Sequence, residues 1–148
     1  MCIFISSLLE LKNNFDVFAF DQWGVLHDGE RAYDGAIKCI EKLSQTSSKI
    51  YIITNSGKRE KDNLNRVVNM GFQTKWIDNI ISSGETAWEA IASFNLPIKS
   101  NYPLNCYIIS RNKHDGINWL KNNPGGICVE TTINADLILL LGIPDDSK

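Results

Sequence analysis

The chain has 148 residues, of which 43% are hydrophobic and 22% are charged, and its formal net charge is −2. These values are ordinary for a single globular domain. The near-neutral charge, without any Lys/Arg-rich run, argues against a nucleic-acid partner, and no apolar run is long enough to span a membrane. The N-terminal apolar stretch lacks the flanks of a signal peptide, so we expect a short helix or a strained start there.

Along the chain, apolar runs alternate with segments of helical periodicity. Strands are expected at residues 17–21, 50–54 and 80–82, and helices at residues 33–43, 58–70 and 84–94. Asp34 is the expected N-cap of the first helix, and the charged residues 58–62 are expected to form a solvated face. This strand–helix alternation predicts a Rossmann-like α/β fold, a parallel sheet with covering helices.

A change in composition marks the second part of the chain. Residues 95–105 contain two prolines and three asparagines and are typical of a linker. Further strands are expected at residues 106–109, 127–129 and 135–141, and a helix at residues 115–121. The last of these strands is apolar throughout, so we expect it to be buried on both faces. The sequence therefore predicts one domain over residues 1–95 and the beginning of another over residues 96–148.

Polar residues follow the first two expected strands. Asp21 ends the first strand, which we expect to be buried, and Thr54 with Asn55 ends the second. Open α/β sheets bind ligands outside the carboxyl ends of their strands, and a carboxylate there can act as a nucleophile. An aspartate before a turn is also common because Asp suits turns. From the residue pattern alone, both interpretations of Asp21 stay open.

The four cysteines show no CxxC pair and no histidine at metal-ligand spacing. These spacings favour reduced, structural thiols over zinc ligation or disulfides. Because reduced thiols are typical of the cytosol, we expect a cytoplasmic protein.

Three segments together resemble a known family: DQWGVLHDG from Asp21, TNSGKR from Thr54 and ISSGETAWEAI from Ile81. In this order and spacing they are similar to the haloacid dehalogenase-like (HAD) hydrolase superfamily, and within it to class IIA, the NagD-like proteins. The likeness runs from about residue 15 to residue 148. It implies that residues 1–95 are the N-terminal part of a HAD-like core and that residues 96–148 begin a C2-type α/β cap.

The resemblance implies roles for four residues. Asp21 matches the nucleophile that forms an aspartyl-phosphate, and its carboxylate also suits Mg²⁺, which prefers oxygen ligands. The backbone carbonyl of Trp23 matches a second metal ligand. Thr54 matches the hydroxyl that hydrogen-bonds the phosphoryl group, and Asn55 adds a backbone N–H at the same edge, where charge develops.

Trp23 departs from the family pattern, because most phosphatases of the superfamily have a general acid, aspartate, at this position. Such a group contributes about a hundred- to ten-thousand-fold in rate, and an indole cannot exchange a proton near neutral pH. The substitution implies either a weak phosphatase or a different leaving group. His27 and Asp28 are alternative acids, or else polar residues of a turn.

The family also uses a lysine and an acidic pair that follow the cap, and we expect this chain to end inside the cap. In one alternative, Asp145 and Asp146 are the acidic pair and Lys113 or Lys121 is the lysine, which would make a small capless phosphatase. The apolar segment before Asp145 resembles a cap strand of class IIA members instead.

The leading hypothesis is a Mg²⁺-dependent phosphatase that acts on small phosphorylated metabolites through Asp21. Without the lysine, the charges of Asp21, metal and phosphate are poorly balanced, so we expect little or no turnover by this truncated chain alone. The second hypothesis is a non-catalytic fragment, or a module that needs a second polypeptide. Its truncated sheet would leave an open edge, which permits self-association.

Overall fold

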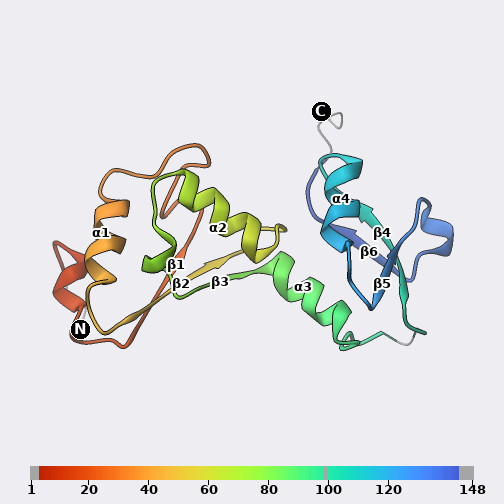
Figure 1. Cartoon of the computed structure of the whole chain (residues 1–148), viewed down its shortest axis with the longest axis horizontal. Helices are drawn as coiled ribbons and strands as arrows, with labels where there is room; N and C mark the ends of the chain where they lie inside the picture. Colours follow the sequence, from red (N-terminus) through yellow and green to blue (C-terminus); the bar gives the residue numbers. More distant parts are fainter. Residues whose placement is uncertain (1–3, 99, 144–148) are drawn as a thin grey trace. The chain divides into compact units, whose positions relative to one another are not determined.

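The computed structural model describes residues 4–98 and 100–143. Contacts divide the chain into two compact units (Figure 1). The first unit comprises Met1–Thr54 and Glu60–Ile81, and the second comprises Asn55–Arg59 and Ser82–Lys148. This division falls before the third helix, whereas the sequence placed a domain boundary after it, at residue 95.

The first unit contains a three-stranded sheet in the order β1-β2-β3. Its elements are the 3₁₀ helix η1 (Leu8–Leu11), β1 (Val17–Asp21), α1 (Ala36–Leu43), β2 (Lys49–Thr54), α2 (Glu60–Asn69), the 3₁₀ helix η2 (Thr74–Trp76) and β3 (Asn79–Ser82). Strands β1 and β2 are parallel, and Asp21 lies opposite Ile53. The expected short N-terminal helix corresponds to η1.

Helix α1 begins later than its sequence pattern predicts. Its N-cap is Gly35, whose φ of 82° is left-handed, and no side chain caps the helix. Glycine adopts this conformation without the steric cost that Asp34 would incur. The prediction of Asp34 as N-cap is therefore wrong.

The core of the first unit lies on one face of its sheet. Ile40 and Leu43 of α1 and Val67 of α2 belong to the same buried cluster as the strand residues Phe18, Ile50, Ile52 and Ile80. On the other face, Val17, Ile53 and Ile81 are 52%, 50% and 43% exposed. The prediction of a buried strand at residues 17–21 thus holds for one face only, because the described helices of this unit pack against that face.

The second unit contains the sheet β5-β4-β6. Its elements are α3 (Ser83–Ala92), β4 (Leu104–Ile109), α4 (Lys113–Leu120), β5 (Gly126–Cys128), the 3₁₀ helix η3 (Thr132–Asn134) and β6 (Leu137–Leu140). Both outer strands pair with β4 in parallel. The predicted α/β class with parallel sheets and covering helices is therefore confirmed.

A second buried cluster joins helices and strands of this unit. Ile91 of α3, Leu104 and Cys106 of β4, and Trp119 and Leu120 of α4 form its centre. The prediction that the last strand is buried on both faces is wrong, because Ile138 and Leu140 of β6 are 55% and 68% exposed.

Cys39, Cys106 and Cys128 are free thiols, and Cys2 lies outside the described residues. Burial raises the pKa of Cys106 to about 11, so this thiol is protonated at neutral pH. Within residues 4–98 and 100–143, the structure has no helix that is both long and apolar enough to cross a membrane.

Candidate active site

Asp21 is the last residue of β1, and its side chain is exposed. Its Oδ1 accepts a hydrogen bond of 2.7 Å from the backbone N–H of Gln22. Within the described part of the chain, no Lys or Arg forms an ion pair with this carboxylate. Asp21 is therefore an accessible oxygen donor at the carboxyl end of a strand, where α/β sheets bind ligands.

Thr54 ends the neighbouring strand β2, and its side chain is buried, at 6% exposure. Because Asp21 lies opposite Ile53 and side chains alternate along a strand, Asp21 and Thr54 leave the sheet on opposite faces. The two residues therefore share the carboxyl edge of the sheet but not a face. Asn55 follows Thr54 in the chain, and its contacts belong to the second unit.

The loop after Asp21 folds back on itself. The carbonyl of Gln22 accepts the N–H groups of Leu26 and His27, and the N–H of Gly24 donates to the carbonyl of His27. Gly24 has a φ of 82°, which only glycine adopts at little steric cost. These bonds close a tight turn directly beyond the strand.

The donors near Asp21 are of the kind that magnesium prefers. Among the hydrogen bonds of the described residues, none ends on the backbone carbonyl of Trp23, so this oxygen is available two residues after Asp21 in the chain. Mg²⁺ is typically held by one or two protein oxygens together with waters and substrate phosphates. No cluster of three His, Cys, Asp or Glu side chains occurs among residues 4–98 and 100–143. The residues present fit a magnesium site completed by water and phosphate.

The indole of Trp23 lies over its own loop and is 65% exposed. Its Nε1 donates to the carbonyl of Asp28 at 3.0 Å. A Cβ added at Gly29 would lie 3.1 Å from the same nitrogen, so glycine permits this packing. The N–H of Trp23 is thus occupied, and an indole N–H does not transfer a proton near neutral pH.

His27 is completely buried, at 0% exposure. Its Nδ1 accepts a 2.9 Å hydrogen bond from the N–H of Gly29, which places the proton of the neutral ring on Nε2. Burial lowers the pKa of His27, and the nearby charge of Arg66 lowers it further. A neutral ring without solvent contact holds the loop together and cannot supply a proton to a leaving group outside it.

Asp28 is also unsuited to act as an acid. Its Oδ1 accepts the backbone N–H groups of Glu30 and Arg31, each at 2.8 Å. The hydrogen bond from Arg31, followed by that from Glu30, lowers the pKa of the Asp28 carboxyl. The carboxylate is therefore ionised at neutral pH and serves as the acceptor of a turn.

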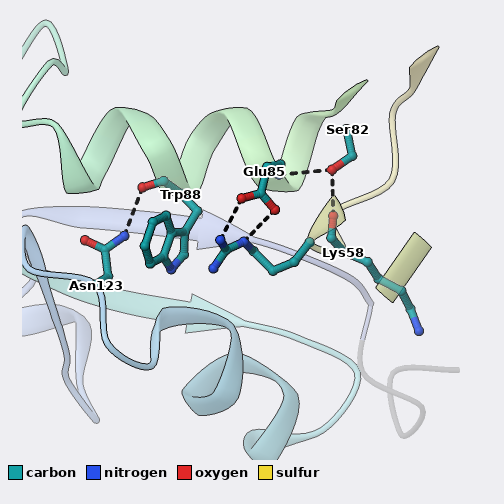
Figure 2. Close-up of polar contacts among 6 residues, drawn as sticks. Lys58, Ser82, Glu85, Trp88 and Asn123 are labelled. Atoms are coloured by element: carbon teal, nitrogen blue, oxygen red, sulfur yellow. Dashed lines mark hydrogen bonds and ion pairs between the residues drawn. The ribbon is translucent and has the colours of Figure 1, made fainter. Parts of the chain in front are cut away.

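In the second unit, residues 55–59 are fastened to the start of α3 (Figure 2). The guanidinium of Arg59 forms two hydrogen bonds to Glu85, at 2.8 and 2.6 Å. The same group lies 3.8 Å from the centre of the Trp88 ring. A fork-shaped guanidinium suits both partners at once, which a lysine would not.

Backbone contacts complete this attachment. The hydroxyl of Ser82 caps α3 by accepting from Glu85 N–H, and it donates to the carbonyl of Lys58 at 2.8 Å. The N–H of Gly84 donates to the carbonyl of Ser56 at 3.0 Å. Residues 55–59 and the first turn of α3 therefore form one packed element, which we call the loop–helix clamp.

The sequence prediction missed this clamp. Arg59 was expected on a solvated face, but its side chain is only 26% exposed and that of Glu85 only 16%. The sequence motifs that contain Arg59 and Glu85 were identified, but their spacing did not predict that these two side chains form an ion pair. The pairing comes from tertiary contacts between segments 26 residues apart.

The two lysines of the capless alternative belong to the second unit. Lys113 begins α4 and pairs with Glu130 at 2.8 Å, and Lys121 follows the same helix. Asp145 and Asp146 lie outside the described residues. The strand that precedes them, β6, pairs with β4 of the second sheet. This pairing agrees with a cap strand rather than with a strand beside β1.

Comparison with known proteins identifies the family. The sequence profile described as haloacid dehalogenase-like hydrolase matches residues 18–111, which is more than half of the chain. The chain therefore belongs to the haloacid dehalogenase-like hydrolases, as its motifs predicted. A search of curated proteins found no match.

Solved structures share the fold at low sequence identity. A haloacid dehalogenase-like hydrolase from Brucella suis matches with a TM-score of 0.78 and 21% identity, over 97% of this chain and 48% of its own. A glycerol phosphate phosphatase from Mycobacterium tuberculosis, solved with calcium, matches with a TM-score of 0.63 and 17% identity, over 93% of this chain and 38% of its own. A 4-nitrophenylphosphatase from Thermotoga maritima matches with a TM-score of 0.60 and 16% identity, over 88% and 46%. The chain thus spans less than half the length of each of these proteins.

Proposed function

We propose that this chain carries the nucleophile and the phosphate-binding edge of a Mg²⁺-dependent phosphatase of small phosphorylated metabolites. The proposal rests on Asp21, an accessible carboxylate at the end of β1 beside the end of β2 at Thr54. The names of two similar structures, a glycerol phosphate phosphatase and a 4-nitrophenylphosphatase, support the same class of reaction. The free thiols of the described cysteines support a cytoplasmic location.

In the proposed reaction, one Asp21 oxygen attacks the phosphorus of the substrate, and the bond from phosphorus to the leaving oxygen breaks. Asp21 and the Trp23 carbonyl would hold Mg²⁺, which neutralises phosphate charge when it is bound. Thr54, from the shared carboxyl edge rather than from the face of Asp21, and the Asn55 N–H would donate to the phosphoryl oxygens, where hydrogen bonds are most effective as charge develops. Water then hydrolyses the aspartyl-phosphate.

The leaving group has no obvious proton donor in this loop. The Trp23 N–H and the Asp28 carboxylate are engaged in hydrogen bonds within it, and the His27 ring is completely buried. General acid catalysis is worth about a hundred- to ten-thousand-fold, so alkyl phosphates would react slowly. Aryl phosphates, whose leaving groups are stable as anions, would be the better substrates.

The proposal is tested by phosphoryl transfer to Asp21. After incubation of the chain with Mg²⁺ and 4-nitrophenyl phosphate and an acid quench, mass spectrometry should find one phosphoryl group on the peptide that contains Asp21. Chelation of Mg²⁺ or the substitution Asp21→Asn should abolish the label, because each removes a reacting or charge-balancing group. Labelling of another residue, or none at all, would refute the nucleophile assignment.

Steady-state turnover of the chain alone should be little or none, since the charge of the site is poorly balanced. Phosphate release from a panel of small phosphoesters measures it. Mg²⁺-dependent release that Asp21→Asn abolishes would contradict this expectation while supporting the nucleophile.

We further propose that the chain self-associates through the open edge of the first sheet. In the described sheet, β1 pairs with β2 on one side only, and Val17 of β1 is 52% exposed. An exposed apolar strand edge favours pairing between chains, and a lysine there disfavours it. Light scattering should show a mass that rises with concentration, and Val17→Lys should reduce this rise. Ile117→Lys, at an exposed position on α4, is the matched control, and a concentration-independent monomer would refute the proposal.

A further inference from the structure

Two cysteines of the second unit lie opposite each other on neighbouring strands. In the parallel pairing of β4 with β5, Cys106 is the register partner of Cys128. The N–H of Val129 donates to the carbonyl of Cys106 at 2.9 Å and fixes this register. Neighbouring strands lie about 4.8 Å apart, and register partners point to the same face of a sheet. The backbone separation is therefore within the range of about 4.4–6.8 Å that a disulfide bridges.

The sulfur of Cys106 already reaches across to β5. A Cβ added at Gly126 would lie 3.2 Å from this Sγ, and the thiol donates to the carbonyl of Leu104 at 3.5 Å. Because side chains alternate along a strand, Gly126 and Cys128 are successive residues on one face of β5. Rotation of Cys106 about its Cα–Cβ bond therefore turns the sulfur from Gly126 toward Cys128.

The two thiols differ in their access to solvent. Cys128 is exposed and is the last residue of β5, which pairs only with β4 in the described sheet. Cys106 is 0% exposed and belongs to the buried cluster that contains Trp119 and Leu120. An oxidant dissolved in water therefore meets Cys128 first. Cys106 reacts only with a group that is brought to it from within the sheet.

We propose that Cys128 and Cys106 form a peroxide-sensitive thiol pair, in which Cys128 is oxidised first and Cys106 then closes a disulfide with it. The Cys128 thiolate attacks one oxygen of hydrogen peroxide, the O–O bond breaks, and hydroxide leaves and takes up the proton that the thiol lost. The Cys106 sulfur then attacks the sulfenic sulfur of Cys128. The S–S bond forms, the S–O bond breaks, and the hydroxyl group leaves as water with the Cys106 proton.

The disulfide is expected to be easily reduced. Cβ atoms joined through a disulfide lie about 3.8 Å apart, which is less than the strand spacing of about 4.8 Å. The bond therefore draws the three-residue strand β5 toward β4. Strained or exposed disulfides are the labile ones, which agrees with the free thiols of the reduced chain. This inference is independent of the proposed phosphatase function, because no residue of the phosphate edge takes part in it.

Peptide mapping of the folded chain after treatment with hydrogen peroxide tests the proposal. The remaining thiols are alkylated, and the chain is digested without reductant. Mass spectrometry should find the Cys106 peptide joined to the Cys128 peptide, with the loss of two hydrogen atoms, and dithiothreitol should separate them. The same treatment in urea should give a mixture of pairings, because the strand register no longer selects the partner.

Variants of each cysteine separate the two steps. In Cys128→Ser, Cys106 should stay an unmodified thiol, because peroxide has no access to it. In Cys106→Ala, Cys128 should stop at the sulfenic acid, which dimedone traps. Cys39→Ser replaces the other described cysteine, which belongs to the first unit, and as the matched control it should keep the link. If Cys106→Ala does not fold, Cys128→Ser still tests the order of oxidation, because its position is exposed.

Four results would overturn the inference. The first is sulfinic or sulfonic acid at Cys128 while Cys106 remains a thiol. The second is a disulfide from Cys128 to Cys39 or Cys2 in the folded chain. The third is oxidation of Cys106 in Cys128→Ser. The fourth is an equal share of the Cys106–Cys128 link in the folded and the urea-unfolded chain, which would show that the register does not select the pair.

Discussion

Replacing Gly84 with alanine is expected to destabilise the second unit by on the order of 3 kcal/mol. A Cβ at this position would overlap the carbonyl groups of Gly57 and Lys58, which are backbone atoms. Alanine gains up to about 1 kcal/mol over glycine inside a helix, but Gly84 lies in the first turn of α3, where that gain is smaller. The steric overlap therefore outweighs the gain in helix propensity, and the substitution lowers the free energy of unfolding. The loop–helix clamp has to open to accommodate the added Cβ.

Urea unfolding monitored by circular dichroism measures this loss. Gly142→Ala is the matched control, because its Cβ would meet only the Arg111 nitrogen, at 3.6 Å. It should change the free energy of unfolding by less than about 0.5 kcal/mol. Equal midpoints for the two variants would show that the close approach of the Gly57 and Gly84 backbones does not exist in solution.

Acidification is expected to destabilise the first unit through His27. Burial, followed by the charge of Arg66, lowers the pKa of His27 in the folded chain below the ordinary value of 6.5. Below about pH 6.5 the unfolded chain takes up a proton that the folded chain resists, so stability falls as the pH falls. The loss begins near this pH and continues until the folded ring is itself protonated, at a slope of at most about 1.4 kcal/mol per pH unit. Protonation also removes the acceptor of the Gly29 N–H, which opens the loop after Asp21.

Unfolding free energies measured in urea between about pH 7.5 and pH 5 test this expectation. His27→Gln should be less stable at neutral pH, because it loses the buried ring, and its stability should vary little with pH in this interval. His114→Gln, measured in the same way, is the control for substituting the other histidine of the chain. A wild-type slope in His27→Gln would assign the titration to another group. The carboxylates with lowered pKa values, such as Asp28, contribute only at lower pH.

Periodicity predicted the elements because it reports which residues face a core. Each predicted strand overlaps an observed one, for example residues 50–54 against Lys49–Thr54. The periodicity did not predict that the described helices cover only one face of each sheet. A continuous apolar run in the sequence is compatible with a strand whose second face is buried and with one whose second face is exposed. Ile138 and Ile53, both about half exposed, illustrate this ambiguity.

The candidate site was predictable in part. A carboxylate or hydroxyl at the end of an apolar run indicates the carboxyl edge of a parallel sheet, and Asp21 and Thr54 lie at that edge. The burial of His27 and the pairing of Arg59 with Glu85 could not be read from the chain, because both depend on contacts between distant segments.

The position of Trp23 also allows the loop after Asp21 to be followed by tryptophan fluorescence. Trp76 and Trp119 are 8% and 6% exposed and Trp88 is partly buried, whereas the Trp23 ring is 65% exposed. A neutral quencher dissolved in water collides with the Trp23 ring far more often than with those two. The quenchable, long-wavelength part of the fluorescence spectrum therefore comes mainly from Trp23, whose backbone carbonyl is the proposed magnesium ligand. The fluorescence of the native chain should thus report the binding of metal and phosphate without an added label.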